Sequence, residues 1–587
     1  MKHILYLCFA GLVVGDRIRY GDDVPVITVK NGSYAGIFTP RYHQDFFLGI
    51  PYAKPAQRFS VAERLNHSWN ETRPAAAYPP HCYGYGPDNI GYEMSEDCLY
   101  LNVVRPSKIS KDAQLPVAIW IHGGGLYMGG SADRRYNLSF VVEQSAQMGK
   151  PIIGVSLNYR LVAFGFLGGE EAQAAGATNI GFRDQRLAIE WIHENIRAFG
   201  GSPEKITIWG ESSGTESVTA QVFAYNGQHN GLFRGAIGQS GFGGIIPRLP
   251  GGYNATALQQ EHFDNLVRNV STCASTVGTP HALECLRNAD FRDINATLSQ
   301  MPALTWSPVL DGDFLADYSA NQVSNGRFAR VPILIGANSD EGTGFGSGKG
   351  PDGGSFNTDD DIRGAIQNFI SPTAGIKTGK SVDDLLDQAL YLYPNIQSAG
   401  IPTLKTWPHV LQPNDNFTQS LGLQYRRGNA FFGDVYMHYL RRRANLAWSR
   451  YGLPSFVYRF DVTVNGKPEF TGATHFQEVA FVFYNINGDA YTVNPFGGDD
   501  HAYSRKARAL AKEISSMWIN FIVDQNPNGY QHQSCESDRW PTFDPTDGGG
   551  AGRGIVFELD HLSVELDDWR AEGINWLIQN DLALIGN

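Results

Sequence analysis

Cysteine, excess positive charge and long apolar segments are all scarce in this chain of 587 residues. Six cysteines allow only a few disulfides. A formal net charge of −12 at pH 7, with no basic stripe, argues against a nucleic-acid partner. Repeats, low-complexity tracts and Pro/Ser-rich linkers are also missing, so we expect one large domain rather than several small ones.

The N-terminus has the pattern of a secretory signal peptide. An apolar stretch from Ile4 to Val14 follows Met1-Lys2 and precedes the polar residues 16–19. The stretch is too short to span a membrane. We therefore expect residues 1–15 to be a signal with an approximate boundary, residues 16–587 to form the mature domain, and the protein to be secreted; the alternative is an N-terminal strand. The last residues, 582–587, contain neither a long apolar tail nor a retention signal, so no stable membrane anchor is expected.

Eight N-x-S/T sequons favour passage through a glycosylating compartment. They begin at Asn31, Asn66, Asn70, Asn137, Asn254, Asn269, Asn295 and Asn416. This density is high for a chain that never enters such a compartment, although export does not require every sequon to be used.

One serine lies in a G-x-S-x-G motif, Gly210-Glu211-Ser212-Ser213-Gly214. An apolar run, 206–209, precedes the motif, and small residues that can begin a helix follow it. This is the strand, sharp turn and helix context of a nucleophile elbow. A serine hydroxyl is a weak nucleophile unless a strained turn holds it beside a base, and the flanking glycines let strand and helix approach closely. A structural turn could carry the same five residues, so the motif indicates a nucleophile only together with the other members of a catalytic site.

A glycine-rich loop offers donors for the oxyanion of an attacked carbonyl. The strand-like run 116–121 leads into His122-Gly123-Gly124-Gly125, the pattern of an oxyanion loop in esterases and lipases. Glycines are needed because side chains would block the amides from turning toward the substrate oxygen. We predict the amides of Gly124, Gly125 and Ser213 as the donors; the alternative is a flexible turn after a strand.

The acid and the base of such a site should follow the serine in loops at strand ends. The strand-like run 331–336 leads to Asp340 and Glu341, and by pattern alone these two carboxylates are equal candidates. His475 opens a loop before the apolar run 479–483. It is one of 15 histidines, and spacing alone cannot identify a base that is assembled in space.

These motifs together resemble the type-B carboxylesterase and lipase family, and the matches run in order through most of the mature chain. Similar segments are 95–103 (SEDCLYLNV), 158–160 (NYR), 184–188 (DQRLA), 195–201 (NIRAFGG), 233–237 (FRGAI), 340–342 (DEG) and 540–543 (WPTF). The stretch through His475 and Glu478 resembles the family's catalytic histidine segment. One difference is Ser213, where the family usually has alanine, but any residue supplies the required amide.

The resemblance implies an α/β-hydrolase fold: a large, mostly parallel sheet flanked by helices, with helical and loop insertions around the site. It also implies serine esterase chemistry on a small-molecule or lipid ester, with no metal and no organic cofactor. Ser212 would attack, His475 would move the proton, and Glu341 would orient the histidine.

The family's disulfide pairing would join Cys82 to Cys98 and Cys273 to Cys285. Each short loop closed in this way is worth about 3 kcal/mol in the loop-entropy model. Cys8 lies in the expected signal, which leaves Cys535 as a surface thiol or an intermolecular disulfide.

The loop between Cys82 and Cys98 has only 15 residues, and it is polar and glycine-rich. In the family this loop covers the site, and in some fungal lipases it is a long mobile lid. So short a loop favours an esterase acting on dissolved or short-chain esters over a triacylglycerol lipase. Choline esters are not favoured, because Asp88 stands where the cholinesterases have a tryptophan for cation–π contact.

Two other functions fit the sequence less well than ester hydrolysis. A non-catalytic binding module on the same fold is the rival from another class, but such modules typically lose the nucleophile. Residues 374–381 fit a relaxed phosphate-loop pattern, yet Ser381 is better explained as the N-cap of a helix over 382–390.

Overall fold

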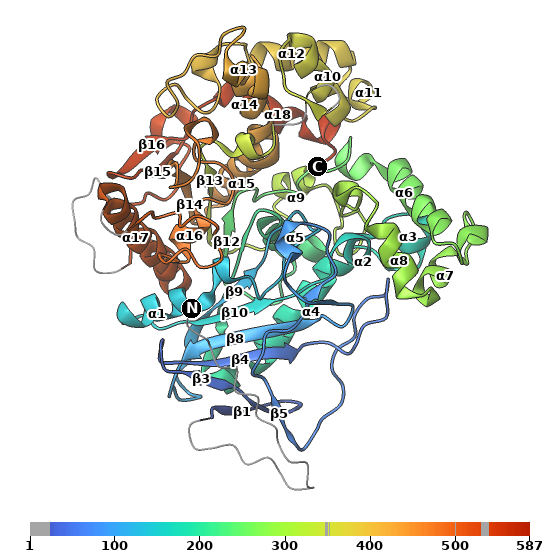
Figure 1. The fold of residues 1–587 in the computed structure, drawn as a ribbon, viewed down its shortest axis with the longest axis vertical. Helices are drawn as coiled ribbons and strands as arrows, with labels where there is room; N and C mark the ends of the chain where they lie inside the picture. The colour runs from blue at the N-terminus through green and yellow to red at the C-terminus, as the bar shows by residue number, and fades with distance from the viewer. Residues whose placement is uncertain (1–23, 347–349, 351–352, 499–500, 530–538) are drawn as a thin grey trace.

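A mixed sheet of eleven strands forms the centre of the computed structural model, which describes residues 24–346, 350, 353–498, 501–529 and 539–587 (Figure 1). The strand order is β16-β15-β14-β13-β12-β11-β9-β10-β8-β4-β3, and two small sheets, β1-β2-β5 and β6-β7, lie outside it. The strands are β1 Val26–Val29, β2 Gly32–Ala35, β3 Ile37–Thr39, β4 Gln44–Pro51, β5 Thr72–Pro74, β6 His81–Cys82, β7 Met94–Ser95, β8 Tyr100–Pro106, β9 Leu115–Ile121, β10 Ile153–Leu157, β11 Gly201–Glu211, β12 Gly235–Gln239, β13 Ile333–Asn338, β14 Ser455–Phe460, β15 Arg553–Phe557 and β16 Leu562–Leu566.

Strands β10, β9 and β11 to β15 run parallel, whereas the pairs nearer the two edges are antiparallel. In a parallel sheet the carboxyl ends of neighbouring strands share one edge, where ligands bind. The loops that follow β9, β11 and β13 are therefore brought to the same edge. They carry the glycine loop, Ser212 and the pair Asp340-Glu341.

Helices cover both faces of the sheet (Figure 1). They are α1 Leu138–Gln147, α2 Val162–Phe166, α3 Glu170–Ala174, α4 Ile180–Asn195, α5 Ser213–Gly227, α6 Thr256–Asn269, α7 Ala282–Asn288, α8 Phe291–Leu298, α9 Ser319–Ser324, α10 Asp359–Phe369, α11 Ala374–Thr378, α12 Val382–Leu392, α13 Asn416–Leu421, α14 Tyr425–Gly433, α15 Tyr439–Arg450, α16 Val479–Val482, α17 Ala502–Asp524 and α18 Ala571–Leu584. Among the described residues, no helix is both long enough and apolar enough to cross a membrane.

The alternation of side chains along β9 explains the two helical layers. Val117 and Ile119 pack in one buried cluster with Val218 of α5. Trp120, on the opposite face of the strand, packs in a second cluster with Trp518 of α17. Because successive side chains of a strand point to opposite faces, one apolar run supplies both cores. The α/β architecture predicted from the sequence is confirmed.

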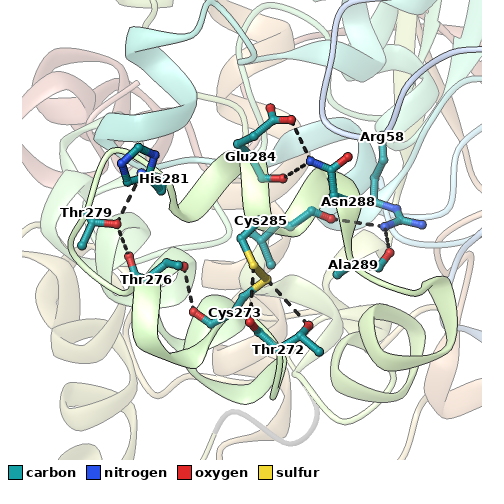
Figure 2. Close-up of a disulfide and its surroundings, with 11 residues drawn as sticks. Arg58, Thr272, Cys273, Thr276, Thr279, His281, Glu284, Cys285, Asn288 and Ala289 are labelled. Carbon is teal, nitrogen blue, oxygen red and sulfur yellow. Dashed lines mark hydrogen bonds between the residues drawn. A yellow bond between two sulfur atoms is a disulfide. The ribbon is translucent and has the colours of Figure 1, made fainter.

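Both disulfides are formed. The Cys82–Cys98 bond has Cα atoms 5.0 Å apart, and the Cys273–Cys285 bond has them 5.6 Å apart, within the usual range. Figure 2 shows the second bond, which joins Cys273, just after α6, to Cys285 of α7, with Arg58 nearby. The Arg58 guanidinium donates to the carbonyl of Ala289 at 2.8 Å and pairs with Glu96 of the first disulfide loop. One arginine thus links the two cross-linked regions.

The segment with the phosphate-loop pattern, residues 374–381, contains helix α11 and the N-cap of α12. Ser381 caps α12 by accepting from the N–H of Asp384 at 3.0 Å, and the Asp384 carboxylate accepts from the N–H of Ser381. This reciprocal capping box confirms the N-cap prediction and explains the local sequence without a nucleotide.

Candidate active site

Ser212 stands at the turn between β11 and α5, where its backbone has φ 56° and ψ −127°. A residue with a Cβ adopts this conformation only when the surroundings impose it. Here the N–H of Ser212 donates to the carbonyl of Gln239 on the neighbouring strand at 2.8 Å. The Thr215 hydroxyl lies 2.7 Å from the same carbonyl. Strand β12 therefore holds the strained turn in place.

The glycines that flank Ser212 are required by close packing. A Cβ on Gly210 would lie 2.3 Å from the carbonyl oxygen of Gly214, and a Cβ on Gly214 would lie 2.2 Å from that of Ile121. Either substitution would push the strand and the helix apart. The packing thus explains both glycines of the motif, as expected for an elbow.

The glycine loop after β9 lies directly against this turn. A Cβ on Gly123 would come within 2.5 Å of the carbonyl oxygen of Glu211 and 3.2 Å of the Ser212 Cβ. Gly124 and Gly125 have φ values of 97° and 64°, which side chains disfavour. Within the described part of the chain, their two amides donate no hydrogen bond, so both remain available to a substrate oxygen.

Glu341 and His475 are joined across two loops. Glu341 follows β13, and its Oε2 is hydrogen-bonded to Nδ1 of His475 at 2.6 Å. Its Oε1 accepts from the Ser240 hydroxyl at 2.5 Å and from the N–H of Asn338 at 2.9 Å. Both oxygens of this buried carboxylate are hydrogen-bonded, so Glu341 is fixed and holds the imidazole in one orientation.

Asp340, the other candidate acid, faces elsewhere. Its Oδ2 accepts from the N–H of Ala473 at 2.9 Å, and its own N–H donates to the carbonyl of Ala473 at 3.0 Å. These contacts link the loop that carries Glu341 to the loop that carries His475. The geometry distinguishes two residues that the sequence left equal: Glu341 contacts the imidazole, and Asp340 contacts the backbone.

The second ring nitrogen of His475 approaches Glu211, the residue before the serine. Nε2 of His475 lies 3.3 Å from Oε1 of Glu211. Among the described residues there is no hydrogen bond between Ser212 and His475, a contact that is often long before substrate binds.

Burial and charge oppose each other at His475. Burial alone lowers the pKa of the imidazole, but the nearby carboxylates of Glu211 and Glu341 outweigh it and raise the pKa to about 9. Burial raises the pKa of Glu211 well above its usual range and also raises that of Glu478. The two carboxyl groups thus favour their protonated forms more than free glutamates do, because burial penalises each negative charge and the neighbouring carboxylates repel one another.

Several supporting residues were not predicted from the sequence. Ser240 follows β12 and has φ 65°, and no motif marks it. Gln239 and Asn338 both donate to the Glu478 carboxylate, at 3.0 and 2.7 Å. Their common signal is that each lies at the end of a parallel strand, which is where polar residues of a site collect.

Asp340 gives a test of this electrostatic arrangement. Burial, reinforced by the Asp461 carboxylate, raises the pKa of Asp340 to about 7 from 3.8. A raised pKa means that the folded state gains most from the protonated form, so this stability is present below pH 4 and is lost as the pH rises toward 7. Asp340→Asn should remove that loss. Its stability advantage over wild type should therefore be small at pH 4 and grow to roughly 2–4 kcal/mol by pH 7. Thermal melts from pH 4 to 8 check this; parallel curves for both proteins would contradict it.

The sequons differ in accessibility. Asn66, Asn70, Asn269 and Asn416 are exposed. Asn31 is buried, and its side-chain amide donates to the carbonyl of His67 at 2.8 Å. The amide nitrogen of Asn254 is also buried, so a glycan at either position would require a local rearrangement. Asn137 and Asn295 are partly exposed, and all eight assignments stay predictions.

Three predictions fall on residues outside the described part of the chain: the signal 1–15, Cys8 within it, and Cys535. Within the described residues, no group of three or more His, Cys, Asp or Glu side chains is placed to hold a metal ion.

Comparison with known proteins identifies relatives of this arrangement. The model of the carboxylesterase family matches residues 23–550. Lipase 1 of Geotrichum candidum is 35% identical over 515 residues, which cover 84% of this chain and 79% of the relative. Secreted lipase 1 of Botryotinia fuckeliana (strain B05.10) is 40% identical over 420 residues, covering 64% of this chain and 67% of the relative. The crystal structure of Aspergillus niger EstA matches with a TM-score of 0.75 at 25% identity, covering 95% of this chain and 99% of that one.

Proposed function

The chain belongs to the carboxylesterase family of carboxylic ester hydrolases, and from that premise we propose that it is a secreted serine esterase that acts through an acyl-enzyme on Ser212. The observation that carries the proposal is the 2.6 Å contact between Glu341 and His475 beside a strained serine. The order serine, acid, histidine along the chain agrees with the order in this fold.

In the proposed first step, the Ser212 hydroxyl oxygen attacks the ester carbonyl carbon while Nε2 of His475 takes the hydroxyl proton. The carbonyl oxygen becomes an oxyanion that accepts from the amides of Gly124, Gly125 and Ser213. When the C–O bond of the ester breaks, the imidazolium returns its proton to the leaving alkoxide and an alcohol departs.

The second step repeats the first with water as the nucleophile. His475 takes a proton from water, the hydroxide oxygen attacks the acyl carbon, and the proton then goes to Ser212 as the carboxylic acid leaves. Glu341 orients the imidazole and stabilises the imidazolium in both steps. Apart from the ester and the water, these steps use only side chains and backbone amides of this chain.

The loop between Cys82 and Cys98 supports action on dissolved esters. The N–H of Tyr85 donates to the carbonyl of Tyr127 at 2.8 Å, and the Asn89 side chain accepts from the N–H of Gly129 at 3.2 Å. Asp88 pairs with Arg135 at 2.6 Å. The loop is thus tied to the segment that follows the glycine loop, whereas a mobile lid needs few such bonds.

Secretion is supported by three observations. The N-terminal pattern is that of a signal, and two disulfides are formed in the structure. Disulfides persist chiefly in oxidising compartments. A relative at 40% identity is named a secreted lipase.

A triacylglycerol lipase is the second candidate, because several of the relatives are named lipases. Initial rates of the purified mature protein on p-nitrophenyl esters from acetyl to palmitoyl, below and above each solubility limit, separate the two. We expect the rate to peak at short, dissolved esters, since the tied Cys82–Cys98 loop is not free to open at an interface. A peak at long chains that jumps when the substrate forms an interface would contradict the esterase assignment and establish the lipase.

A further inference from the structure

A buried ion pair lies one helical turn beyond Ser212. Glu216 is on α5, and its N–H donates to the carbonyl of Ser212 at 3.0 Å. Its two carboxylate oxygens accept from Nη1 and Nη2 of Arg248 at 2.8 and 2.5 Å. The Glu216 side chain is 0% exposed and the Arg248 side chain is 3% exposed. Water therefore could not solvate either charge if its partner were removed.

The same guanidinium reaches the glycine loop. Nε of Arg248 donates to the carbonyl of Gly125 at 3.1 Å, and Nη1 also donates to the carbonyl of Ile246 at 3.1 Å. Four of the five N–H donors of the guanidinium are thus directed at acceptors of the protein. Arg248 therefore connects three parts of the chain: the helix after the nucleophile, its own loop after β12, and the loop after β9.

The contact with Gly125 fixes one peptide plane. The Gly125 carbonyl and the Leu126 amide belong to the same peptide unit, and the Leu126 N–H donates to the Ser213 hydroxyl at 3.1 Å. The plane is thus bonded at both of its edges. The preceding unit, which carries the Gly125 N–H, is held at its Gly124 carbonyl, which accepts from the N–H groups of Tyr127 and Met128 at 3.1 and 3.0 Å. Arg248 adds the anchor on the other side of Gly125, where a glycine would otherwise let the two units change their relative orientation.

We propose that Arg248, held by Glu216, is a positioning residue that pre-orients the Gly125 amide for the oxyanion. This inference rests on the proposed esterase function. A donor stabilises the transition state most when no energy is needed to turn it during the reaction. A buried ion pair by itself adds little or nothing to stability compared with apolar side chains of the same size, so its placement against the oxyanion loop calls for another role.

The test compares Arg248→Met with the double variant Glu216→Leu/Arg248→Met. The single variant leaves the Glu216 charge buried and unpaired, so its Tm should fall. The double variant removes both charges and should recover most of the Tm, yet it still lacks the donor to Gly125. We expect kcat per titrated active site to fall about 10- to 100-fold in both variants, less than the loss of a direct oxyanion donor, with KM for a short ester nearly unchanged.

A tetrahedral adduct gives a readout that a structural role would not change. Ser212 adds to the carbonyl carbon of a trifluoromethyl ketone, and the carbonyl oxygen becomes an oxyanion. The affinity of both variants for this ketone should therefore fall by the same factor as kcat. The affinity for the corresponding alcohol, a competitive inhibitor without an oxyanion, should not change. Recovery of kcat together with Tm in the double variant, or an unchanged affinity for the ketone, would overturn the inference.

The pair Asp45–Arg105 provides the matched control. Arg105 donates to Asp45 at 3.0 Å and to the carbonyl of Phe199 at 3.0 Å, and both side chains are buried at the β4–β8 edge of the sheet. Arg105→Met should lower Tm as Arg248→Met does, but leave kcat and the affinity for the ketone unchanged. Wild-type protein without hydrolysis of any ester would instead refute the proposed function, and this inference with it.

Discussion

Replacing Ser212 by alanine should abolish turnover and leave the fold intact. Loss of the nucleophile in a comparable triad lowers kcat by about 10⁶-fold, and we expect a loss of 10⁵- to 10⁶-fold here. The backbone should not change, because alanine has the same Cβ that serine already accommodates at φ 56° and ψ −127°. Single-turnover rates on p-nitrophenyl acetate and a thermal melt measure the two effects.

Ser212→Gly separates the chemistry from the strain. It is equally inactive, but glycine tolerates this conformation, so part of the roughly 1–3 kcal/mol stored at such a residue should be recovered as stability. Substantial activity in either variant would show that another residue is the nucleophile. An unchanged Tm for the glycine variant would show that the turn costs little.

The local parts of the site could be predicted from the sequence because each is encoded within a few residues. The elbow needs small residues on both sides of Ser212, and the distances at Gly210 and Gly214 show why. The glycine loop needs φ values that only glycine adopts readily. The two disulfides lie in short loops, and both were given by resemblance to a family.

The parts assembled from distant segments could not be predicted in the same way. Asp340 and Glu341 are neighbours in the chain, and only the direction of each side chain shows which one meets His475. Ser240 is 101 residues from Glu341 and hydrogen-bonded to it, and Arg248 lies 123 residues from Gly125. Such pairs are set by the strand order, and no periodicity in the sequence reports them.

Glu341→Gln should lower kcat by about 10⁴-fold, the loss seen when a triad acid becomes an amide. The structure gives the reason. Oε1 of Glu341 already accepts from Ser240 and Asn338, so the glutamine oxygen would keep that position and its NH₂ group would face Nδ1 of His475. An NH₂ donor requires Nδ1 to be unprotonated, which puts the imidazole proton on Nε2. That nitrogen could then no longer take the proton of Ser212.

Asp340→Asn is the matched control, since it makes the same chemical change one residue away. Its oxygen can still accept from the N–H of Ala473, so the link between the two loops remains and the His475 tautomer is unaffected. We expect kcat within a few-fold of wild type, measured on the same short ester at the same pH. A larger loss for Asp340→Asn than for Glu341→Gln would make Asp340 the acid and would require the two loops to rearrange when substrate binds, because only Glu341 contacts the imidazole in this structure.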